Sequence, residues 1–440
     1  MEQATNQPAA NPQIGEPSAA ERKRQMVAIG IGNFMEWFDF AIYGYFAAII
    51  GAQFFPSGDA TAEMLSALAV FAVGFISRPV GALILGPMGD RIGRKAVLMI
   101  TVLGMGVITA LIGLTPAYAT IGIAAPIIVV VLRLLQGAMV GGEWTSAATY
   151  IGESAPPKKR ALYASVVTAT AGLAFLVGTF FAVALTAMME DDALNSWGWR
   201  IPFIASLLMG VVALYIRRRL SDTEVFNTVS AKRIAGTLEK TSTSSRVKAF
   251  IVTFAFSGIF GVALYYFVTY MNNYLSGPVG MDRFDALLTT GIVMVIYVIF
   301  NPVAGVLTDR FGRKPMNHIG IIGLIVWSLP AFWLMSTASP FLSIVALVPF
   351  AFFVACTAVT NNVLLVEVFP ASIRSSGSAI GYNVAYAALA GPGPLIAAWL
   401  VAATGSLISP AYYVIAVGIF SLAILWPMLK ETKDVDISHG

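Results

Sequence analysis

Long apolar stretches recur along the whole chain, and they restrict its fold more than any other feature. A stretch of about 18 or more apolar residues can cross the hydrocarbon core of a bilayer as an α-helix. Apolar residues make up 58% of the 440 residues and charged residues only 11%, against about 45–50% and about 25% in soluble domains. We predict an all-α membrane protein with twelve spans, at residues 26–51, 65–87, 96–115, 121–152, 161–189, 199–216, 249–275, 286–308, 316–336, 341–366, 375–403 and 410–429.

Two sequence motifs occur twice, in the same order and at nearly the same offset. Gly86–Lys95 reads GPMGDRIGRK, and Gly305–Lys314 reads GVLTDRFGRK, 219 positions later. The pattern E-x-x-P-x-x-x-R begins at Glu153 and again at Glu367, 214 positions later. Two ordered motifs at nearly one offset indicate an internal duplication, so we expect two pseudo-symmetric bundles of six helices.

A polar and basic stretch lies between the sixth and seventh predicted spans, where the repeat places its boundary. It opens with three successive arginines at 217–219. We therefore divide the chain into a disordered cytoplasmic tail (1–25), an N-terminal six-helix bundle (26–216), a cytoplasmic central loop (217–248), a C-terminal six-helix bundle (249–429) and a short cytoplasmic tail (430–440).

The basic residues are distributed unequally between the two ends of the predicted bundles. All but four of the 27 lysines and arginines fall on the side of the N-terminus, and the opposite loops carry acids such as Asp59 and Glu190. Because cytoplasmic loops are enriched in Lys and Arg, both termini and the central loop should be cytoplasmic. We expect a multi-pass protein of the bacterial plasma (inner) membrane.

The composition argues against several kinds of site. The single cysteine, Cys356, lies inside an apolar stretch, and His318 and His439 are the only histidines. A disulfide framework or a metal site built from Cys or His is therefore not expected. A membrane enzyme would have little from which to build a nucleophile–base set, so we expect a protein that is not an enzyme, with no cofactor, no metal and no nucleic-acid partner.

The repeated loops combine glycines with charges of both signs. Glycines let helix backbones approach closely and tolerate positive φ, and the acids can form ion pairs with neighbouring arginines. An ordinary cytoplasmic loop needs only basic charge, so the acids and glycines point to a network that ties spans together on the cytoplasmic side. We assign this cytoplasmic gate to Gly86, Asp90, Arg94 and Glu153 in the first half, and to Asp309, Arg313 and Glu367 in the second.

Further motifs identify a family. The first span contains Gly32–Phe40 (GNFMEWFDF), followed later by Arg78-Pro79, by Gln136–Glu143 and by Trp197–Phe203 (WGWRIPF). With the repeated loops, they resemble the major facilitator superfamily, and within it the metabolite:proton symporter family, over nearly all of the chain. The resemblance implies the major facilitator fold and proton-driven uptake of a small solute such as proline, glycine betaine, α-ketoglutarate, citrate or shikimate.

Five ionisable residues lie well inside the predicted spans of the first half: Glu36, Asp39, Arg78, Arg133 and Glu143. A charge at the bilayer centre is costly, so these residues should face a cavity or one another. With a rise of about 1.5 Å per residue, the depths suggest that Asp39 lies near Arg133, and that Glu36 or Glu143 lies near Arg78.

Proton coupling needs a carboxylate that takes a proton in one conformation and pairs with arginine in another. We assign this role to Asp39 with Arg133, supported by Glu36. Arg133 also resembles the fourth-span arginine of proton-coupled sugar porters, whose partner is a first-span aspartate in the place of Asp39. A static ion pair that only fixes helix packing is the alternative.

Arg78 is our candidate for the substrate carboxylate, because arginine binds carboxylates bidentately; pairing only with Glu36 or Glu143 is the alternative. Tyr266, Tyr270 and Asn273 should share one face of the seventh span at helical spacing. Electron-rich rings opposite an arginine would suit a betaine. The full set of expected substrate-binding residues is Arg78, Glu143, Trp144, Tyr43, Tyr266, Tyr270, Asn273, Asn361, Tyr382 and Asn383.

The sequence thus predicts a secondary active transporter that imports a small carboxylate-bearing metabolite or a zwitterionic solute of the proline/glycine betaine type with a proton, by alternating access. A symporter of di- or tricarboxylates, such as α-ketoglutarate or citrate, or of a shikimate-type acid is the first alternative. A drug efflux antiporter is the alternative from another class. The expected partners are the substrate, the proton and the lipid bilayer, and the expected functional unit is a monomer.

Overall fold

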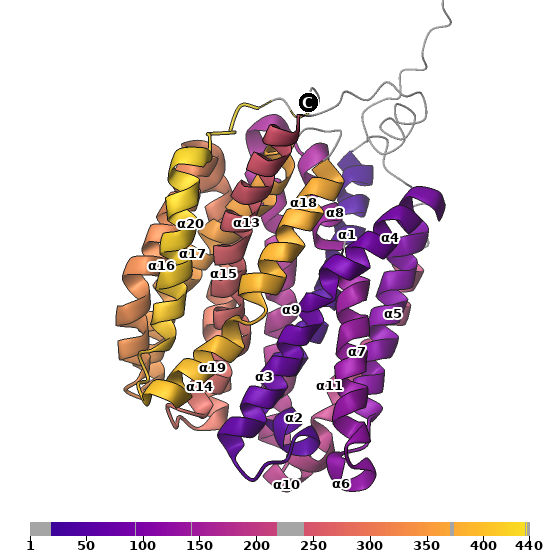
Figure 1. Cartoon of the computed structure of the whole chain (residues 1–440), viewed down its shortest axis with the longest axis vertical. Helices are drawn as coiled ribbons and strands as arrows, with labels where there is room; N and C mark the ends of the chain where they lie inside the picture. Colours follow the sequence, from indigo (N-terminus) through magenta and orange to yellow (C-terminus); the bar gives the residue numbers. More distant parts are fainter. Residues whose placement is uncertain are drawn as a thin grey trace, which may run out of the picture.

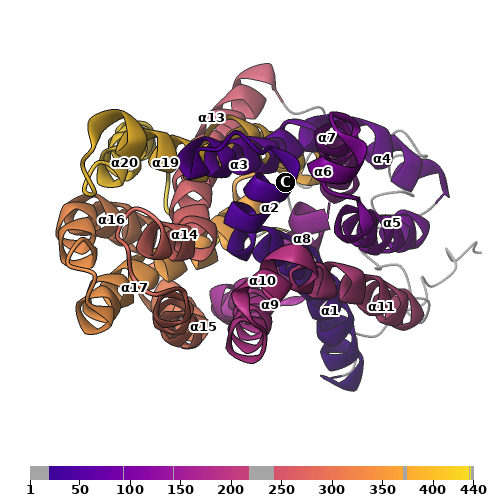
Figure 2. The ribbon, with the colours of Figure 1, turned by 90° about the horizontal axis from the view of Figure 1, so that it is seen from below.

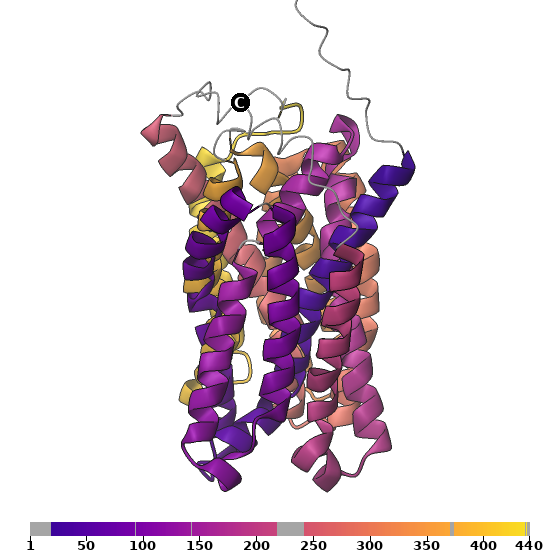
Figure 3. The same ribbon diagram turned by 90° about the vertical axis from the view of Figure 1, so that its right-hand side faces the viewer.

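The computed structural model describes residues 19–92, 94–141, 143–217, 242–369, 374–435 and 437. Regular structure in these residues is helical throughout. The helices run roughly parallel and form two bundles side by side, one indigo to magenta and the other pink to yellow (Figures 1 and 2). Figure 3 shows that the connections between helices lie at the two ends of the bundle.

The N-terminal half contains several spans that are broken into two helices, because turns or capping residues interrupt them. Its helices are α1 (Ala19–Tyr45), α2 (Ala47–Phe54), α3 (Ala60–Ile76), α4 (Arg78–Ile92), α5 (Arg94–Leu114), α6 (Tyr118–Ile121), α7 (Ala124–Val140), α8 (Glu143–Ser154), η1 (Pro157–Lys159), α9 (Arg160–Met188), α10 (Asp191–Ala193), η2 (Leu194–Gly198) and α11 (Arg200–Arg217).

The C-terminal half has two spans interrupted by a π-helical turn, η3 and η4. Its helices are α13 (Thr243–Tyr265), η3 (Tyr266–Tyr270), α14 (Met271–Ser276), α15 (Arg283–Phe311), α16 (Arg313–Met335), α17 (Pro340–Glu367), α18 (Arg374–Ala385), η4 (Tyr386–Ala390), α19 (Gly393–Thr404) and α20 (Pro410–Met428). The first of these begins at Thr243, so it extends into the stretch that the sequence predicted as central loop.

Each of the twelve predicted spans coincides with one helix or with two or three consecutive helices. Among the described residues, eight helices are long and apolar enough to cross a bilayer, and a pair bent by 42° around Trp199 supplies a ninth. Two shorter apolar helices lie at Met99–Leu114 and Ala124–Val140. Large apolar side chains such as Leu83, Phe180 and Val326 are exposed, as expected where lipid is the solvent.

The two halves meet along several pairs of helices, of which α9 and α15 share the longest contact. Gly305 allows this contact near its cytoplasmic end, because a Cβ there would lie 2.9 Å from the Cα of Leu162. Gly312 follows α15 with a φ of 104°, a left-handed conformation that favours glycine. In the second copy of the repeated loop, both predicted uses of glycine are confirmed.

Contacts join the halves at both ends of the molecule. At one end, Arg160 of α9 forms a salt bridge with Glu367 of α17, at 2.7 Å. At the other, the Asn273 side chain of α14 donates a 2.7 Å hydrogen bond to the carbonyl of Gly44 in α1. The conformation is therefore occluded, with neither end open along these contacts.

Candidate functional site

The break between α3 and α4 positions the most deeply buried arginine of the first half. Ser77 ends α3, and Pro79 occupies the first turn of α4, where its missing N–H costs little. Arg78 therefore stands at a helix start rather than in the middle of a regular span. Its side chain is 0% exposed.

Aromatic rings surround the Arg78 guanidinium. Its central carbon lies 4.3 Å from the ring centroid of Phe75 and 4.8 Å from that of Phe40, both in the N-terminal half. Tyr386, from the C-terminal half, lies at 5.8 Å. Among the described residues, no hydrogen-bond acceptor contacts the three guanidinium nitrogens apart from the nearby Tyr265 hydroxyl. A buried cation held mainly by rings lacks most of the charge-assisted hydrogen bonds that normally offset its desolvation.

Polar aromatic side chains from both halves converge on the same place. Tyr265 interacts electrostatically with both Arg78 and Glu36, and its ring packs edge-on against that of Phe75, with centroids 4.9 Å apart. Tyr382 stacks on Tyr386 with ring centroids 4.1 Å apart. Trp144 of α8 lies parallel to Tyr382, with centroids 6.3 Å apart.

These rings carry buried polar atoms with few hydrogen-bond partners in the described part of the chain. The hydroxyls of Tyr265, Tyr382 and Tyr386 and the indole nitrogen of Trp144 are buried, and beyond one another and Arg78 they have no hydrogen-bond partner in the described part of the chain. Buried polar groups normally have partners. We call the set of Arg78, Trp144, Tyr265, Tyr382 and Tyr386 the central cluster. It has the composition of a site for a ligand with one carboxylate and one cationic group.

A second polar group lies inside the N-terminal half. Thr109 of α5 donates a 2.7 Å hydrogen bond to the Asp39 carboxylate of α1, and it accepts one of 2.7 Å from the Gln136 side chain of α7. The Gln136 carbonyl oxygen accepts a hydrogen bond from Arg133. The Arg133 guanidinium carbon lies 3.4 Å from the ring centroid of Tyr43. We call these five residues the Asp39 network.

The structure modifies the predicted pairings of buried charges. Asp39 and Arg133 interact electrostatically, as the depths suggested, but Thr109 and Gln136 bridge them in place of a direct ion pair. Aromatic rings surround the Arg78 guanidinium, and Tyr265 interacts electrostatically with both Arg78 and Glu36. Aromatic rings and neutral polar side chains are the nearest neighbours of these arginines. These neighbours come from other helices, which an estimate of depth along one helix does not include.

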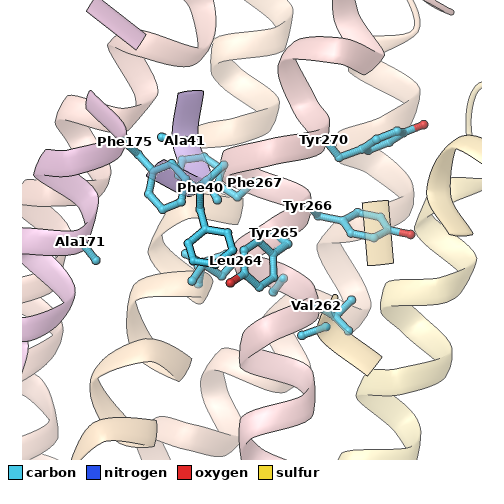
Figure 4. Close-up of a cluster of buried hydrophobic side chains, with 14 of the residues drawn as sticks. Phe40, Ala41, Ala171, Phe175, Val262, Leu264, Tyr265, Tyr266, Phe267 and Tyr270 are labelled. Atoms are coloured by element: carbon cyan, nitrogen blue, oxygen red, sulfur yellow. The ribbon is translucent and has the colours of Figure 1, made fainter. Parts of the chain in front are cut away.

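The predicted common face holds for Tyr266 and Tyr270, whose ring centroids lie 5.6 Å apart, and it is wrong for Asn273. Tyr266 and Tyr270 point away from Phe40 and Tyr265, into the C-terminal half (Figure 4), and Tyr266 packs against Phe332 and Tyr413. Asn273 faces Gly44 of the other half. The π-helical turn η3 is the physical reason, because its wider turn shifts the phase of every residue after it.

The three asparagines predicted to bind substrate use their amides within the protein. Asn273 bonds to Gly44 at one end of the interface, and Asn383 donates a 2.6 Å hydrogen bond to the carbonyl of Gly141 of the other half. Asn361 accepts a 2.8 Å hydrogen bond from Ser257 inside the C-terminal half. These amides connect helices in the occluded conformation, and their contact with a substrate stays a prediction.

The second copy of the predicted gate comes together at the end of the bundle where α15 and α17 end. Arg313 donates two 3.0 Å hydrogen bonds to the Glu367 carboxylate and lies 3.4 Å from Asp309. Asp309 accepts hydrogen bonds of 3.0 and 2.9 Å from the backbone N–H groups of Ala161 and Leu162. These belong to the first turn of α9, where the helix dipole favours negative charge. The gate therefore joins one half to the other.

Several predicted residues fall outside the described side chains. These are Glu143 of the expected substrate site, and Gly86, Asp90, Arg94 and Glu153 of the first copy of the gate. Their assigned roles stay predictions.

Sequence reasoning did not assign Thr109, Gln136 or Arg160 to a site, and the expected substrate-binding set left out Tyr265 and Tyr386. Two of them could have been found: Gln136 belongs to a family motif, and Arg160 ends the E-x-x-P-x-x-x-R pattern. Nothing in the sequence distinguishes Thr109 from other threonines of apolar helices. The orientation of Tyr265 and Tyr386 depends on the π-helical turns beside them.

Comparisons with known proteins agree with this architecture. The family model described as Major Facilitator Superfamily matches residues 29–394 and 274–439. The proline/betaine transporter of Escherichia coli (strain K12) is 34% identical over 422 residues, covering 94% of this chain and 84% of the relative. The glycine betaine/proline/ectoine/pipecolic acid transporter OusA of Dickeya dadantii (strain 3937) is 33% identical with the same coverage.

Solved structures share the fold at lower sequence identity. The proton:xylose symporter XylE bound to 6-bromo-6-deoxy-D-glucose has a TM-score of 0.76 at 18% identity, covering 96% of this chain and 99% of that one. The inward open conformation of XylE from E. coli has a TM-score of 0.71 at 19% identity, covering 95% and 98%. The two-bundle fold is therefore the one seen in those proteins.

Proposed function

Because the chain belongs to the major facilitator superfamily, we propose that it is a secondary active transporter of the bacterial inner membrane, with both termini in the cytoplasm. It imports a small zwitterionic solute of the proline/glycine betaine type together with a proton, by alternating access between its two halves. The names of the relatives support this solute class. The proton gradient drives the cycle without a cofactor, and the protein is a transporter rather than an enzyme.

The main support for the proposal comes from the surroundings of the Arg78 guanidinium. Among the described residues no hydrogen-bond acceptor contacts its guanidinium apart from the nearby Tyr265 hydroxyl, although it is fully buried between Phe40 and Phe75. A substrate carboxylate would supply the missing acceptors bidentately. The rings of Trp144, Tyr265, Tyr382 and Tyr386 would then receive the ammonium group of the same molecule through their electron-rich faces.

The central cluster also favours one substrate class over the alternatives. A di- or tricarboxylate needs a second cation, and Arg133 is already held by Gln136 and the Tyr43 ring. A zwitterion needs one carboxylate site and one cation site, which is the composition of the central cluster. Because both halves of a single chain contribute to this cluster, we expect the monomer to be the functional unit.

The Asp39 network supplies the proton-coupling step of the proposal. Asp39 is buried in the first half, and Arg133 acts on it electrostatically without a direct bond. Protonation of Asp39 removes a buried negative charge, and a later approach of Arg133 restores the carboxylate. One proton would thereby enter with each cycle.

The test is uptake by purified protein in proteoliposomes with an imposed pH gradient, acidic outside. Labelled proline and glycine betaine should accumulate, and a protonophore should abolish the accumulation. Ectoine, shikimate, α-ketoglutarate and citrate complete the panel. Gradient-dependent accumulation of the dicarboxylate or tricarboxylate alone would select the first alternative, and no accumulation of any compound would overturn symport.

Substitutions at Arg78 and Asp39 test the roles proposed for these two residues. Arg78→Gln should raise KM roughly 10- to 100-fold, because charge-assisted hydrogen bonds contribute about 1.5–3 kcal/mol. The same substitution at Arg246, which is exposed on α13, is the matched control. Asp39→Asn should abolish concentrative uptake while substrate exchange continues. Normal KM in the Arg78 variant, or full accumulation in the Asp39 variant, would contradict the assigned role.

A further inference from the structure

Four side chains of the Asp39 network form one continuous row of hydrogen bonds. Arg133 donates to Gln136, Gln136 donates to Thr109, and Thr109 donates to Asp39, the last two bonds each being 2.7 Å long. The residues come from three helices, α1, α5 and α7. All four are at most 4% exposed, so water competes little with these bonds.

Arg133 fixes the direction of this row. A guanidinium can only donate, so the Gln136 atom that it contacts must be the carbonyl oxygen. The Gln136 nitrogen therefore faces Thr109 and donates to its hydroxyl oxygen. The Thr109 hydroxyl proton must then point to Asp39. Whatever the protonation state of Asp39, one of its carboxyl oxygens accepts this bond, and an acidic proton belongs on the other oxygen.

The row also determines how far the positive charge of Arg133 helps Asp39 to ionise. Arg133 is the charged residue that acts electrostatically on Asp39 among the described residues, and Glu36 lies one turn away on the same helix. Gln136 and the ring of Tyr43 hold the guanidinium, and its other two nitrogens have no partner in the described chain. An ionised Asp39 would leave both charges buried without the direct bonds that offset their desolvation.

We propose that Gln136 is a positioning residue that holds Arg133 away from Asp39 in the occluded state. Thr109 connects Gln136 to the Asp39 carboxyl group through its hydroxyl. This inference rests on the proposed proton symport. While Gln136 holds the guanidinium, Asp39 keeps its proton. When the conformation changes and Arg133 leaves Gln136, the guanidinium bonds directly to the Asp39 oxygens, and the acid proton passes to water on the cytoplasmic side. Arg133 stays charged throughout.

The decisive variant is Gln136→Leu, which is close in size but cannot hold the guanidinium. Arg133 should then pair with Asp39 in every state. Protonation would require more acid, so the pH of half-maximal glycine betaine uptake should move to acidic pH by about one unit or more. Concentrative uptake at neutral pH should fall roughly tenfold, since one pH unit is a factor of ten in protonated carrier.

Exchange of labelled for unlabelled glycine betaine should stay within about twofold. Gln53→Leu, which removes a hydrogen bond to Asn195 at the surface, is the matched control.

A second pair of variants tests the proposal even if the protein does not fold with leucine at position 136. Thr109→Ser keeps the hydroxyl, and Thr109→Val removes it without changing the shape of the side chain. The serine variant should retain the pH profile, whereas the valine variant should shift it. Equal profiles in the two variants, or an unshifted profile in folded Gln136→Leu protein, would overturn the proposal.

The native protein in the same assay distinguishes a failure of the proposed symport from a failure of the role proposed for Gln136 and Thr109. If native protein shows no proton-driven uptake of glycine betaine or proline, the proposed function fails. If it accumulates either solute and the variants match it at every pH, the symport stands and the role of Gln136 and Thr109 fails.

Discussion

At the scale of single residues, the central cluster explains why aromatic side chains with polar tips gather between the halves. Tyr265, Tyr382 and Tyr386 each bury a ring against neighbours from the other half or their own. Among the described residues, their hydroxyls and the Trp144 indole nitrogen have no hydrogen-bond partner beyond one another and Arg78. A polar ring with few partners is a poor choice for packing alone, because phenylalanine would fill the space without the desolvation cost. The hydroxyls are therefore best explained by a polar ligand.

Trp144 gives a prediction at this scale. The substitution Trp144→Leu should raise KM for glycine betaine roughly tenfold and KM for proline less than about threefold. A quaternary ammonium can use only the ring face, worth about 0.5–2 kcal/mol, whereas the proline ammonium can also donate hydrogen bonds. Competition uptake with both labelled solutes measures the ratio. Trp399→Leu, on an exposed face, serves as the control, and an equal change for both solutes would refute a ring-face contact.

At the scale of helices, the repeated loop is a device for close approach of one half to the other. Gly305 lets α15 pass the start of α9, and Asp309 accepts hydrogen bonds from two N–H groups of that start. Glu367 receives Arg313 from its own half and Arg160 from the other. The second copy of the motif therefore lies where the two halves meet at this end of the molecule.

Gly305→Val tests this interpretation. Its side chain would have to displace the backbone of α9, because even a Cβ would lie 2.9 Å from the Leu162 Cα. We expect the maximal uptake rate to fall at least about tenfold, while the ratio of KM values for proline and glycine betaine stays the same. Gly393→Ala, where a Cβ would meet its nearest atom at 3.6 Å, is the control. A changed substrate preference in the Gly305 variant would show that the loop does more than close the cytoplasmic side.

At the scale of the whole molecule, the residues after α20 fold back over the cytoplasmic gate. Glu431 accepts hydrogen bonds of 2.8 and 3.0 Å from the first two N–H groups of α16, at Arg313 and Lys314. Thr432 donates a 2.6 Å hydrogen bond to the Glu367 carboxylate, and Arg160 of the other half lies 3.4 Å from the carbonyl oxygen of Val435. The C-terminal segment thus contacts both halves at the place where they close.

Loss of Glu431 should therefore weaken cytoplasmic closure. In Glu431→Ala, a cysteine placed at Leu162 should react with a membrane-impermeant maleimide roughly tenfold faster in inside-out vesicles, because about 1.4 kcal/mol of lost closure corresponds to a factor of ten. The measurement needs a Cys356→Ser background, since Cys356 is the single native cysteine. Glu190→Ala, at the opposite end of the molecule, is the control, and equal labelling rates would show that the segment does not stabilise the closed side.

Much of this architecture was predictable from particular residues. The two copies of the loop around Asp90 and Asp309 established the duplication, and the apolar stretches established twelve spans that the helices match. The depth of Asp39 and Arg133 correctly placed them near each other. These features depend on counting along a helix with a regular rise, which the sequence alone supports.

Other features were decided only by the tertiary structure. The π-helical turn at Tyr266–Tyr270 takes Asn273 off the face that Tyr266 and Tyr270 share, because one wide turn changes the phase of the residues after it. Thr109 joins the Asp39 network because α5 packs beside α1 and α7. The sequence by itself determined which charges are buried and at what depth, since burial in a membrane follows composition and length. The structure decided which side chains meet them, because packing between helices follows no period along the chain.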